Sequence, residues 1–399
     1  MLWLLGGLVA LAGAFSYGEL SSAMSRSGGE YHLLSEIYHP IVGFSSGWIS
    51  ITVGFTAPIA AASMALGAYG SSVILDLGYI APEQKKIAAL LLAFSSVTAV
   101  TIIHLFKDTV VSNFQVVFTT LKILLILSVI VLGFSIDSPT NINFLPSTQA
   151  VEEIMSAPFA IALVYVMYAY SGWNASIYIA DEVKNPGRNL PLSLFIGTLI
   201  VILLYVPLNS VFLYSTPLTE FKGQVDVGLI AAKHILGQSG GMIMGALIAF
   251  GLISTISSMV WAGPRVSMVI GEDTRILRFF AKKNNSGVPA VSLFVQYVIV
   301  LFFIFTSTFD TVVTYIGFLM TLSSLLTVIG VFVMRCKRPQ MERPYMTWGY
   351  PVTPLFFIMV MSAILFFLIK EKPMITLAGC ATIIVGLLIY WINQYVMDS

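Results

Sequence analysis

Long apolar segments follow one another along almost the whole chain, and this pattern restricts the fold more than any other feature. Most are close to or above the ~20 residues that a helix needs to cross the hydrocarbon core of a bilayer. Only 10% of the residues are charged, whereas an ordinary soluble protein has about 25%. This composition excludes a soluble enzyme, a basic nucleic-acid-binding protein and a disordered chain.

The segments predict an all-α membrane protein, because they are long and lack the strict alternation of a barrel strand. We expect about eleven spans, at 2–23, 41–70, 87–106, 111–134, 156–180, 191–214, 240–269, 289–307, 311–334, 351–369 and 374–394. The composition nowhere changes to a soluble pattern. The sequence therefore predicts a single polytopic membrane domain over residues 1–399.

Basic residues in the predicted loops indicate how the chain is oriented. One alternating set of loops carries twelve Lys and Arg residues, Lys107 among them, and the other set carries six. The richer side is expected to be cytoplasmic. With an odd number of spans, the C-terminus then lies inside and the N-terminus outside. We expect a multi-pass protein of the plasma (cytoplasmic) membrane.

No motif of a catalytic or energy-coupling site accompanies the apolar segments. The sequence has no phosphate-binding glycine loop, which a carrier driven by ATP would need, and its four histidines lack the spacing of metal ligands. The two cysteines, Cys336 and Cys380, predict neither a disulfide framework nor a metal site. We therefore expect no enzymatic activity, metal, cofactor or nucleic-acid partner.

Lys122 lies deep in the segment 111–134, with more than one helical turn of apolar residues on each side. An ammonium at this depth costs at least ~2.5–3.5 kcal/mol. We expect it to face the bundle interior as a fixed or protonatable charge in a transport site. The alternative is a lysine that extends to the membrane interface, since Asn113 and Phe114 lie about two turns away.

The segment 156–180 contains a weak point for a helix near its centre, at a Ser-Gly pair surrounded by aromatic and polar residues. A break in a membrane helix frees peptide groups, which are tolerated only beside protein or a wet cavity and can there bind a small zwitterion. The alternative is a simple kink with aromatic packing. The candidate substrate-binding residues are Tyr168, Tyr170, Ser171, Gly172, Trp173 and Asn174.

Two weaker signals lie nearer the expected cytoplasmic side. Glu182 and Arg265 stand close to the inner ends of two predicted spans, as a candidate inner gate or as solvated charges at the rim. Thr255, Ser257 and Ser258 form a small polar patch in the segment 240–269. Hydroxyl groups in membrane helices usually bond to their own helix or to a neighbour, so packing is the default interpretation of this patch.

Several short stretches occur in an order that resembles a known family. They are Ser16-Tyr-Gly-Glu-Leu, Arg26-Ser-Gly-Gly-Glu-Tyr31, Tyr168-Ala-Tyr-Ser-Gly-Trp-Asn, Asp181-Glu-Val-Lys-Asn-Pro-Gly-Arg-Asn-Leu-Pro191, Arg338-Pro-Gln-Met-Glu-Arg-Pro-Tyr and Gly349-Tyr-Pro-Val-Thr-Pro354. Together they resemble the amino acid–polyamine–organocation permeases, especially the L-type amino acid transporters. The resemblance implies a leucine-transporter-like fold of inverted repeats, in which the broken first helix of each repeat forms the substrate site.

The resemblance begins at the family's second helix. The eleven predicted spans would then correspond to family helices 2–12, and the first helix, with its glycine-rich unwound segment, is expected to be missing. A record truncated at its start is the favoured explanation, and the domain is expected to be incomplete at its N-terminus.

The resemblance also implies roles for individual residues. Ser171 and Gly172 resemble the unwound segment of the second broken helix, although family members often have another small residue in place of Ser171. Tyr168 matches an aromatic gate, and Asn174 is a candidate polar contact. Lys122 resembles the lysine of sodium-independent members, whose ammonium stands where sodium-coupled relatives hold a cation. The loop 71–86 has no cysteine, so no disulfide-linked subunit is expected.

The function predicted from these features is secondary transport of amino acids by alternating access, as exchange or import, independent of sodium. A neutral substrate is expected because aromatic residues, and no acidic residue, surround the predicted site. The alternatives are a non-transporting membrane scaffold or sensor and an inactive truncated permease. A channel is disfavoured because the sequence lacks a repeated filter motif.

Overall fold

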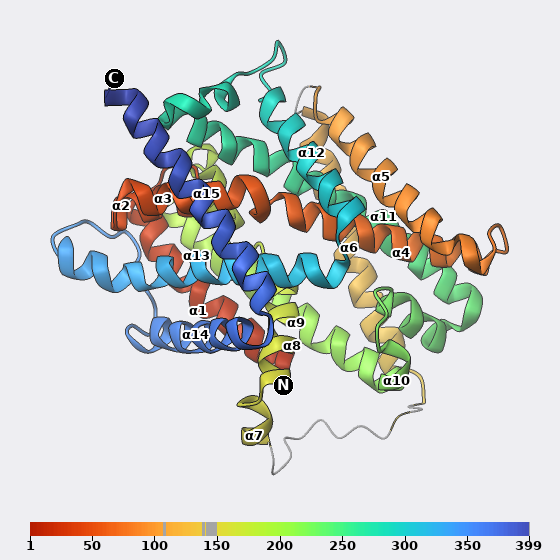
Figure 1. The fold of residues 1–399 in the computed structure, drawn as a ribbon. Coiled ribbons are helices and arrows are strands. Elements are labelled where there is room, and N and C mark those ends of the chain that lie inside the picture. Colours follow the sequence, from red (N-terminus) through yellow and green to blue (C-terminus); the bar gives the residue numbers. More distant parts are fainter. Residues whose placement is uncertain (107–108, 138–139, 141–149, 399) are drawn as a thin grey trace.

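The computed structural model describes residues 1–106, 109–137, 140 and 150–398, and these residues form helices and loops without a strand (Figure 1). Lys107, one of the basic residues counted for orientation, lies outside them. The α-helices are α1 (Leu2–Ala23), α2 (Glu30–Ile37), α3 (Pro40–Ile49), α4 (Thr56–Asp76), α5 (Lys85–Ile103), α6 (Thr109–Phe134), α7 (Ala150–Ile154), α8 (Ala157–Tyr170), α9 (Pro186–Ser215), α10 (Leu218–Phe221), α11 (Val227–Asp273), α12 (Ala290–Thr306), α13 (Phe309–Lys337), α14 (Val352–Glu371) and α15 (Pro373–Asp398). A π-helical turn, Ser50–Gly54, joins α3 to α4, and three 3-10 helices are η2 (Pro82–Gln84), η3 (Ala175–Glu182) and η4 (Arg275–Ala281).

Nine helical stretches among the described residues are long and apolar enough to cross a bilayer. They coincide with nine of the eleven expected spans. Of the other two, α12 is apolar but has 17 residues, and the segment 156–180 is divided between α8 and η3. All eleven segments are thus helical, and the predicted all-α membrane fold is confirmed.

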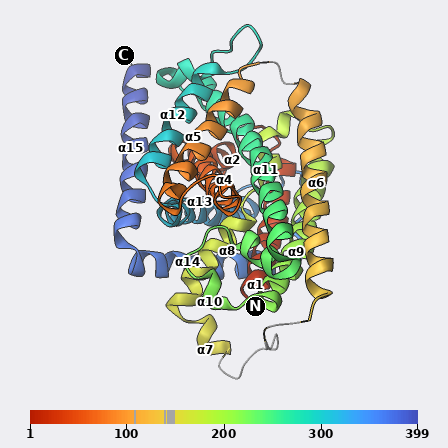
Figure 2. The same cartoon turned by 90° about the vertical axis from the view of Figure 1, so that its right-hand side faces the viewer.

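The helices are arranged with α1 inside and several others at the periphery. In their most apolar stretches, 78% of the residues of α1 are buried, against 11% in α6 and α15. Figure 2 shows α15 and α6 on opposite sides of the molecule, with α4 and α8 between them. The outer helices expose large apolar side chains such as Leu91, Leu124 and Leu388, which suit contact with lipid.

Small residues allow α1 to pack closely inside the bundle. A Cβ atom at Gly13 would come within 2.8 Å of ring atoms of both Trp173 and Phe357, so glycine is needed for this approach. Small residues are enriched at helix interfaces in membranes for this reason, because backbones can then come close together. The packing of α1 places its surface directly against the segment that follows α8.

Candidate functional site

The helix over the segment 156–180 is interrupted at the predicted place. α8 ends at Tyr170; Ser171 then has an extended backbone, with ψ 150°, and Gly172 has φ +93°, a conformation that favours glycine. The N–H groups of Gly172, Trp173 and Asn174 donate to no acceptor among the described residues. The break therefore leaves peptide groups available to a ligand.

Two cavities flank the break. The larger, about 340 Å³, lies against α9 and is lined by Tyr170, Ser171, Gly172 and Tyr205 among others. Its volume lies in the range of about 300–1,000 Å³ that is typical of small-molecule sites. The smaller cavity, about 70 Å³, lies on the side of α13, where Ser171 and Gly172 also contribute. The free peptide groups therefore stand between two hollows.

The aromatic residues near the break form walls. Tyr168 lines the smaller cavity. The hydroxyl of Tyr170 donates to the carbonyl oxygen of Trp3 at 2.9 Å, and the Tyr170 ring contacts those of Trp3 and Tyr205. Trp173 meets the ring of Tyr17 edge-on, with centroids 4.7 Å apart. Aromatic packing and a cavity thus occur together here, where the sequence left them as alternatives.

Asn174 is buried beneath the break, and its amide is already engaged. Its Nδ2 atom donates to Oε1 of Glu30 at 2.6 Å. No local pattern marks Glu30 as a site residue: the available signal is a charged residue directly after Gly28-Gly29, and nothing near it in the sequence shows which groups it would contact. Direct contact of Asn174 with a substrate stays a prediction.

Lys122 faces the interior of the bundle. Its ammonium donates to Oγ1 of Thr255 on α11 at 3.3 Å, and its methylene groups lie next to Gly251. The side chain lines a cavity of about 360 Å³. Ala169 and Tyr205 line both this cavity and the larger cavity at the break, so the two adjoin. The alternative of a lysine extended to the membrane interface is not what the structure shows.

Glu182 and Arg265 are brought together, as a gate would require. Arg265 Nε lies 3.5 Å from Oε1 of Glu182, and its guanidinium lies 3.7 Å from the centroid of the Trp261 ring. The pair lines a polar cavity of about 260 Å³ to which Tyr178 also contributes. Glu182 is more than half exposed, so the pair contributes about 0–1 kcal/mol to stability. Its role as a gate stays a prediction.

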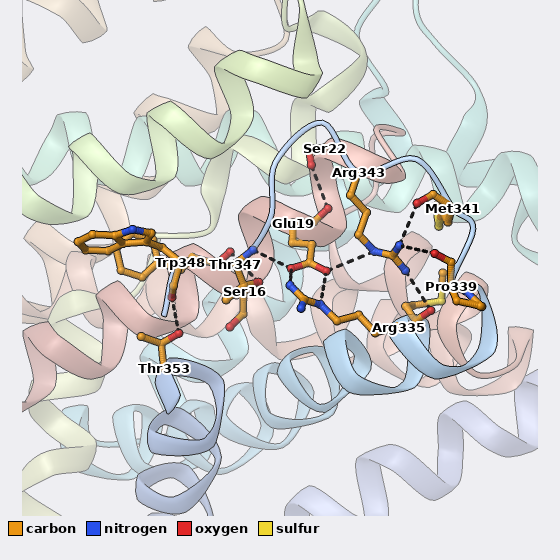
Figure 3. Close-up of polar contacts among 12 residues, drawn as sticks. Ser16, Glu19, Ser22, Arg335, Pro339, Met341, Arg343, Thr347, Trp348 and Thr353 are labelled. Carbon is orange, nitrogen blue, oxygen red and sulfur yellow. Dashed lines mark hydrogen bonds and ion pairs between the residues drawn. The ribbon is translucent and has the colours of Figure 1, made fainter. Parts of the chain in front are cut away.

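A second polar cluster, centred on Glu19, was not predicted (Figure 3). The buried carboxylate of Glu19 accepts from Arg335 Nε at 2.9 Å and Nη2 at 2.7 Å, and from the Thr347 N–H at 2.7 Å. Arg343 Nε lies 3.3 Å away, and the Arg335 guanidinium lies 3.7 Å from the centroid of the Tyr350 ring. These contacts hold the loop after α13 against the end of α1.

The sequence of the chain also matches known proteins. The model of the family described as "Amino acid permease" matches residues 1–390. The chain is 26% identical over 405 residues to the b(0,+)-type amino acid transporter 1 of Mus musculus, covering 99% of this chain and 80% of that protein. It is 26% identical over 349 residues to the Cystine/glutamate transporter of Homo sapiens, covering 86% and 68%.

A third relative is the Large neutral amino acids transporter small subunit 2 of Mus musculus, 25% identical over 404 residues, which cover 99% of this chain and 74% of that protein. Matches to transporters thus extend over nearly the full length of the chain. The chain belongs to the amino acid permease family, within the amino acid–polyamine–organocation superfamily of membrane transporters, and is similar to its L-type members.

Proposed function

We propose that this protein is a secondary carrier that moves neutral amino acids across the plasma membrane by alternating access, independently of sodium. The observation that carries the proposal is the break at residues 171–174, where unpaired N–H groups stand beside two cavities. Interrupted helices of this kind bind small charged substrate groups in membrane carriers, because peptide dipoles replace the water that the substrate loses. The C-terminus is proposed to be cytoplasmic, from the basic loops.

The composition of the larger cavity supports a neutral substrate. The described residues that line it include Tyr170, Trp173 and Tyr205 and no acidic residue. A cationic side chain would need a carboxylate partner in such a site, since an unpaired buried charge is strongly unfavourable. N–H groups at the break suit a substrate carboxylate, and the aromatic walls suit an apolar side chain.

Lys122 supports the proposal of sodium independence. Its ammonium projects into a cavity that adjoins the larger cavity at the break. A fixed positive charge repels a second cation at short range, and the repulsion is stronger away from bulk water. We also propose that the carrier functions without a disulfide-linked subunit, because the loop 71–86 has no cysteine.

The direct test is counterflow in proteoliposomes that contain the purified full chain. Vesicles loaded with unlabelled amino acid are diluted into labelled leucine, arginine, glutamate or cystine, in sodium or choline buffer. We expect saturable counterflow, fastest with leucine and equal in the two buffers. Non-saturable conductance would instead indicate a channel, and an absence of counterflow with all four amino acids would refute the carrier.

Gly172→Ala is expected to lower counterflow about tenfold. An L-residue in the left-handed region costs roughly 1–2 kcal/mol, and 1.4 kcal/mol corresponds to about a factor of ten. The added methyl group meets no atom within 4 Å, so the effect comes from rotation of the peptide groups. The matched control is Gly223→Ala, which also has positive φ, +76°, and open space around it. Equal loss in both variants would contradict a specific role of the break.

A further inference from the structure

Among the described residues, only neutral donors hydrogen-bond to the buried carboxylate of Glu30. It begins α2 and is 1% exposed. Oε1 accepts from the Tyr17 hydroxyl at 3.0 Å and from Asn174 Nδ2 at 2.6 Å, and Oε2 accepts from the Tyr178 hydroxyl at 2.5 Å. None of the ion pairs among the described residues includes Glu30. A buried carboxylate without a cation is costly in a protein and is therefore unusual as a purely structural element.

The partners of Glu30 connect it to two cavities. Asn174 lines the cavity of about 70 Å³ at the break. Tyr178, which lies in η3, lines the cavity of about 260 Å³ that contains the Glu182–Arg265 pair. Glu30 thus lies between the proposed substrate site and the polar cavity beyond it, one hydrogen bond away from a residue of each.

The donors around Glu30 are fixed by packing. The Tyr178 ring meets Phe55 edge-on at a centroid distance of 5.2 Å. The Tyr178 ring also packs against Gly29, which has φ +59°. A Cβ atom at this position would collide with the ring. The Tyr178 hydroxyl is therefore held toward the carboxylate rather than being free to turn to water.

The charged groups of the surrounding elements are engaged elsewhere. On α2, Tyr31 donates to Asp273, His32 is a further titratable group, and Glu36 pairs with Arg338. Around α2, Arg26 pairs with Asp273, Asp181 accepts the Ser27 N–H, Arg335 pairs with Glu19, and Lys337 donates to the carbonyl oxygen of Ile37.

Burial raises the pKa of the Glu30 carboxyl, which lies outside the membrane-spanning helices, while the hydrogen bonds from its three neighbours oppose the rise.

We propose that Glu30 binds and releases one proton in each transport cycle, so that a proton is the cation coupled to the substrate. This inference rests on the proposed carrier function. The proton adds to a carboxylate oxygen from water in one cavity and leaves to water in the other, and no other bond is made or broken. Coupling is thereby assigned to Glu30, while the charge of Lys122 stays fixed.

The ionised and protonated forms of Glu30 differ in the hydrogen bonds that they make to Tyr17, Asn174 and Tyr178. The ionised carboxylate accepts from all three donors and ties Asn174 and Tyr178 to Tyr17 of α1. In the protonated carboxyl one oxygen is itself a donor, so a proton on Oε2 is donated to the Tyr178 hydroxyl, which then no longer donates to Glu30. The bonds from Tyr17 and Asn174 lose the negative charge that strengthens them. Protonation therefore weakens the hydrogen bonds that tie the segment beyond the break to α1, and in this proposal that weakening favours opening toward the polar cavity.

The test compares Glu30→Gln with Glu36→Gln, the exposed glutamate of the same helix. Vesicles with equal amino acid on both sides receive an external pH one unit below the internal pH, and counterflow at equal pH is measured on the same preparation. A gradient of one unit supports up to about tenfold accumulation per proton. We expect accumulation by wild type and Glu36→Gln, and an accumulation ratio of about 1 for Glu30→Gln.

Two results would overturn the proposal while leaving the carrier function intact: accumulation by Glu30→Gln equal to wild type, or wild-type counterflow with no response to the gradient. Absence of wild-type counterflow would instead refute the carrier itself.

If Glu30→Gln does not fold or carries no substrate, Glu30→Asp and Tyr178→Phe replace it. Glu30→Asp should still accumulate substrate. Tyr178→Phe removes a donor to the charged form, so the pH midpoint of counterflow should rise by about one unit; an unchanged midpoint overturns the proposal.

Discussion

Replacing Lys122 with alanine is expected to lower amino acid counterflow at least about tenfold while leaving the yield of folded protein close to that of wild type. The ammonium donates to Thr255 inside the bundle, and a hydrogen bond to a charged group contributes about 1.5–3 kcal/mol. We expect this hydrogen bond to stabilise the conformation that carries substrate. Its loss then corresponds to at least about a tenfold fall in the transport rate. Folding should suffer little, because the variant no longer has to bury a charge.

Two further variants make the measurement specific. Thr255→Val keeps the shape of the acceptor but removes its oxygen, so it should reproduce part of the loss. Lys86→Ala removes a lysine at the exposed end of α5 and should leave counterflow unchanged. Each variant is assayed by counterflow and by size-exclusion chromatography. Wild-type counterflow in Lys122→Ala would remove this residue from the mechanism.

Glu19→Gln is expected to destabilise the protein by about 3–5 kcal/mol, seen as a large fall in the unfolding temperature in detergent. Removing one partner of a buried ion pair leaves the other charge without compensation. Here the loss affects two guanidinium groups, of Arg335 and Arg343, whose side chains are 20% and 11% exposed. The Thr347 N–H would keep a neutral acceptor at best.

The matched control for Glu19 is Glu36→Gln. Glu36 pairs with Arg338 at 3.4 Å, and both side chains are about half exposed. An exposed pair contributes about 0–1 kcal/mol, so the unfolding temperature should change little. Thermal unfolding of the three proteins in the same detergent gives the comparison. A fall for Glu19→Gln no larger than for Glu36→Gln would show that the cluster in Figure 3 does not stabilise the fold.

The spans and the break could be predicted because both depend on local properties of the chain. The segment 111–134, which is mostly apolar despite residues such as Asn113 and Lys122, is long enough for a helix in lipid. The pair Ser171-Gly172 is sufficient to mark a weak point within the predicted helix 156–180. The helix boundaries do not follow from apolar content alone, since α11 begins at Val227 and continues through a kink at Gly237 that apolar content does not mark.

The partners of the polar side chains could not be predicted in this way. Asn174 was marked as a candidate polar contact, and the structure adds that it donates to Glu30, which is 144 positions away in the sequence. Glu19 and Arg335 are separated by 316 positions. Neither pairing leaves a local pattern, because it depends on how helices far apart in the chain pack against one another.

The sequence by itself determined that this chain lies in a membrane as a bundle of helices and that one helix breaks at Ser171-Gly172, since lipid requires each helix to satisfy its own backbone. Only the tertiary structure decided which charges are buried together: Glu19 with two arginines, and Glu30 among three neutral donors. The reason is physical. Burial is a property of the packed bundle, and the energy of a charge depends on the groups that surround it after packing.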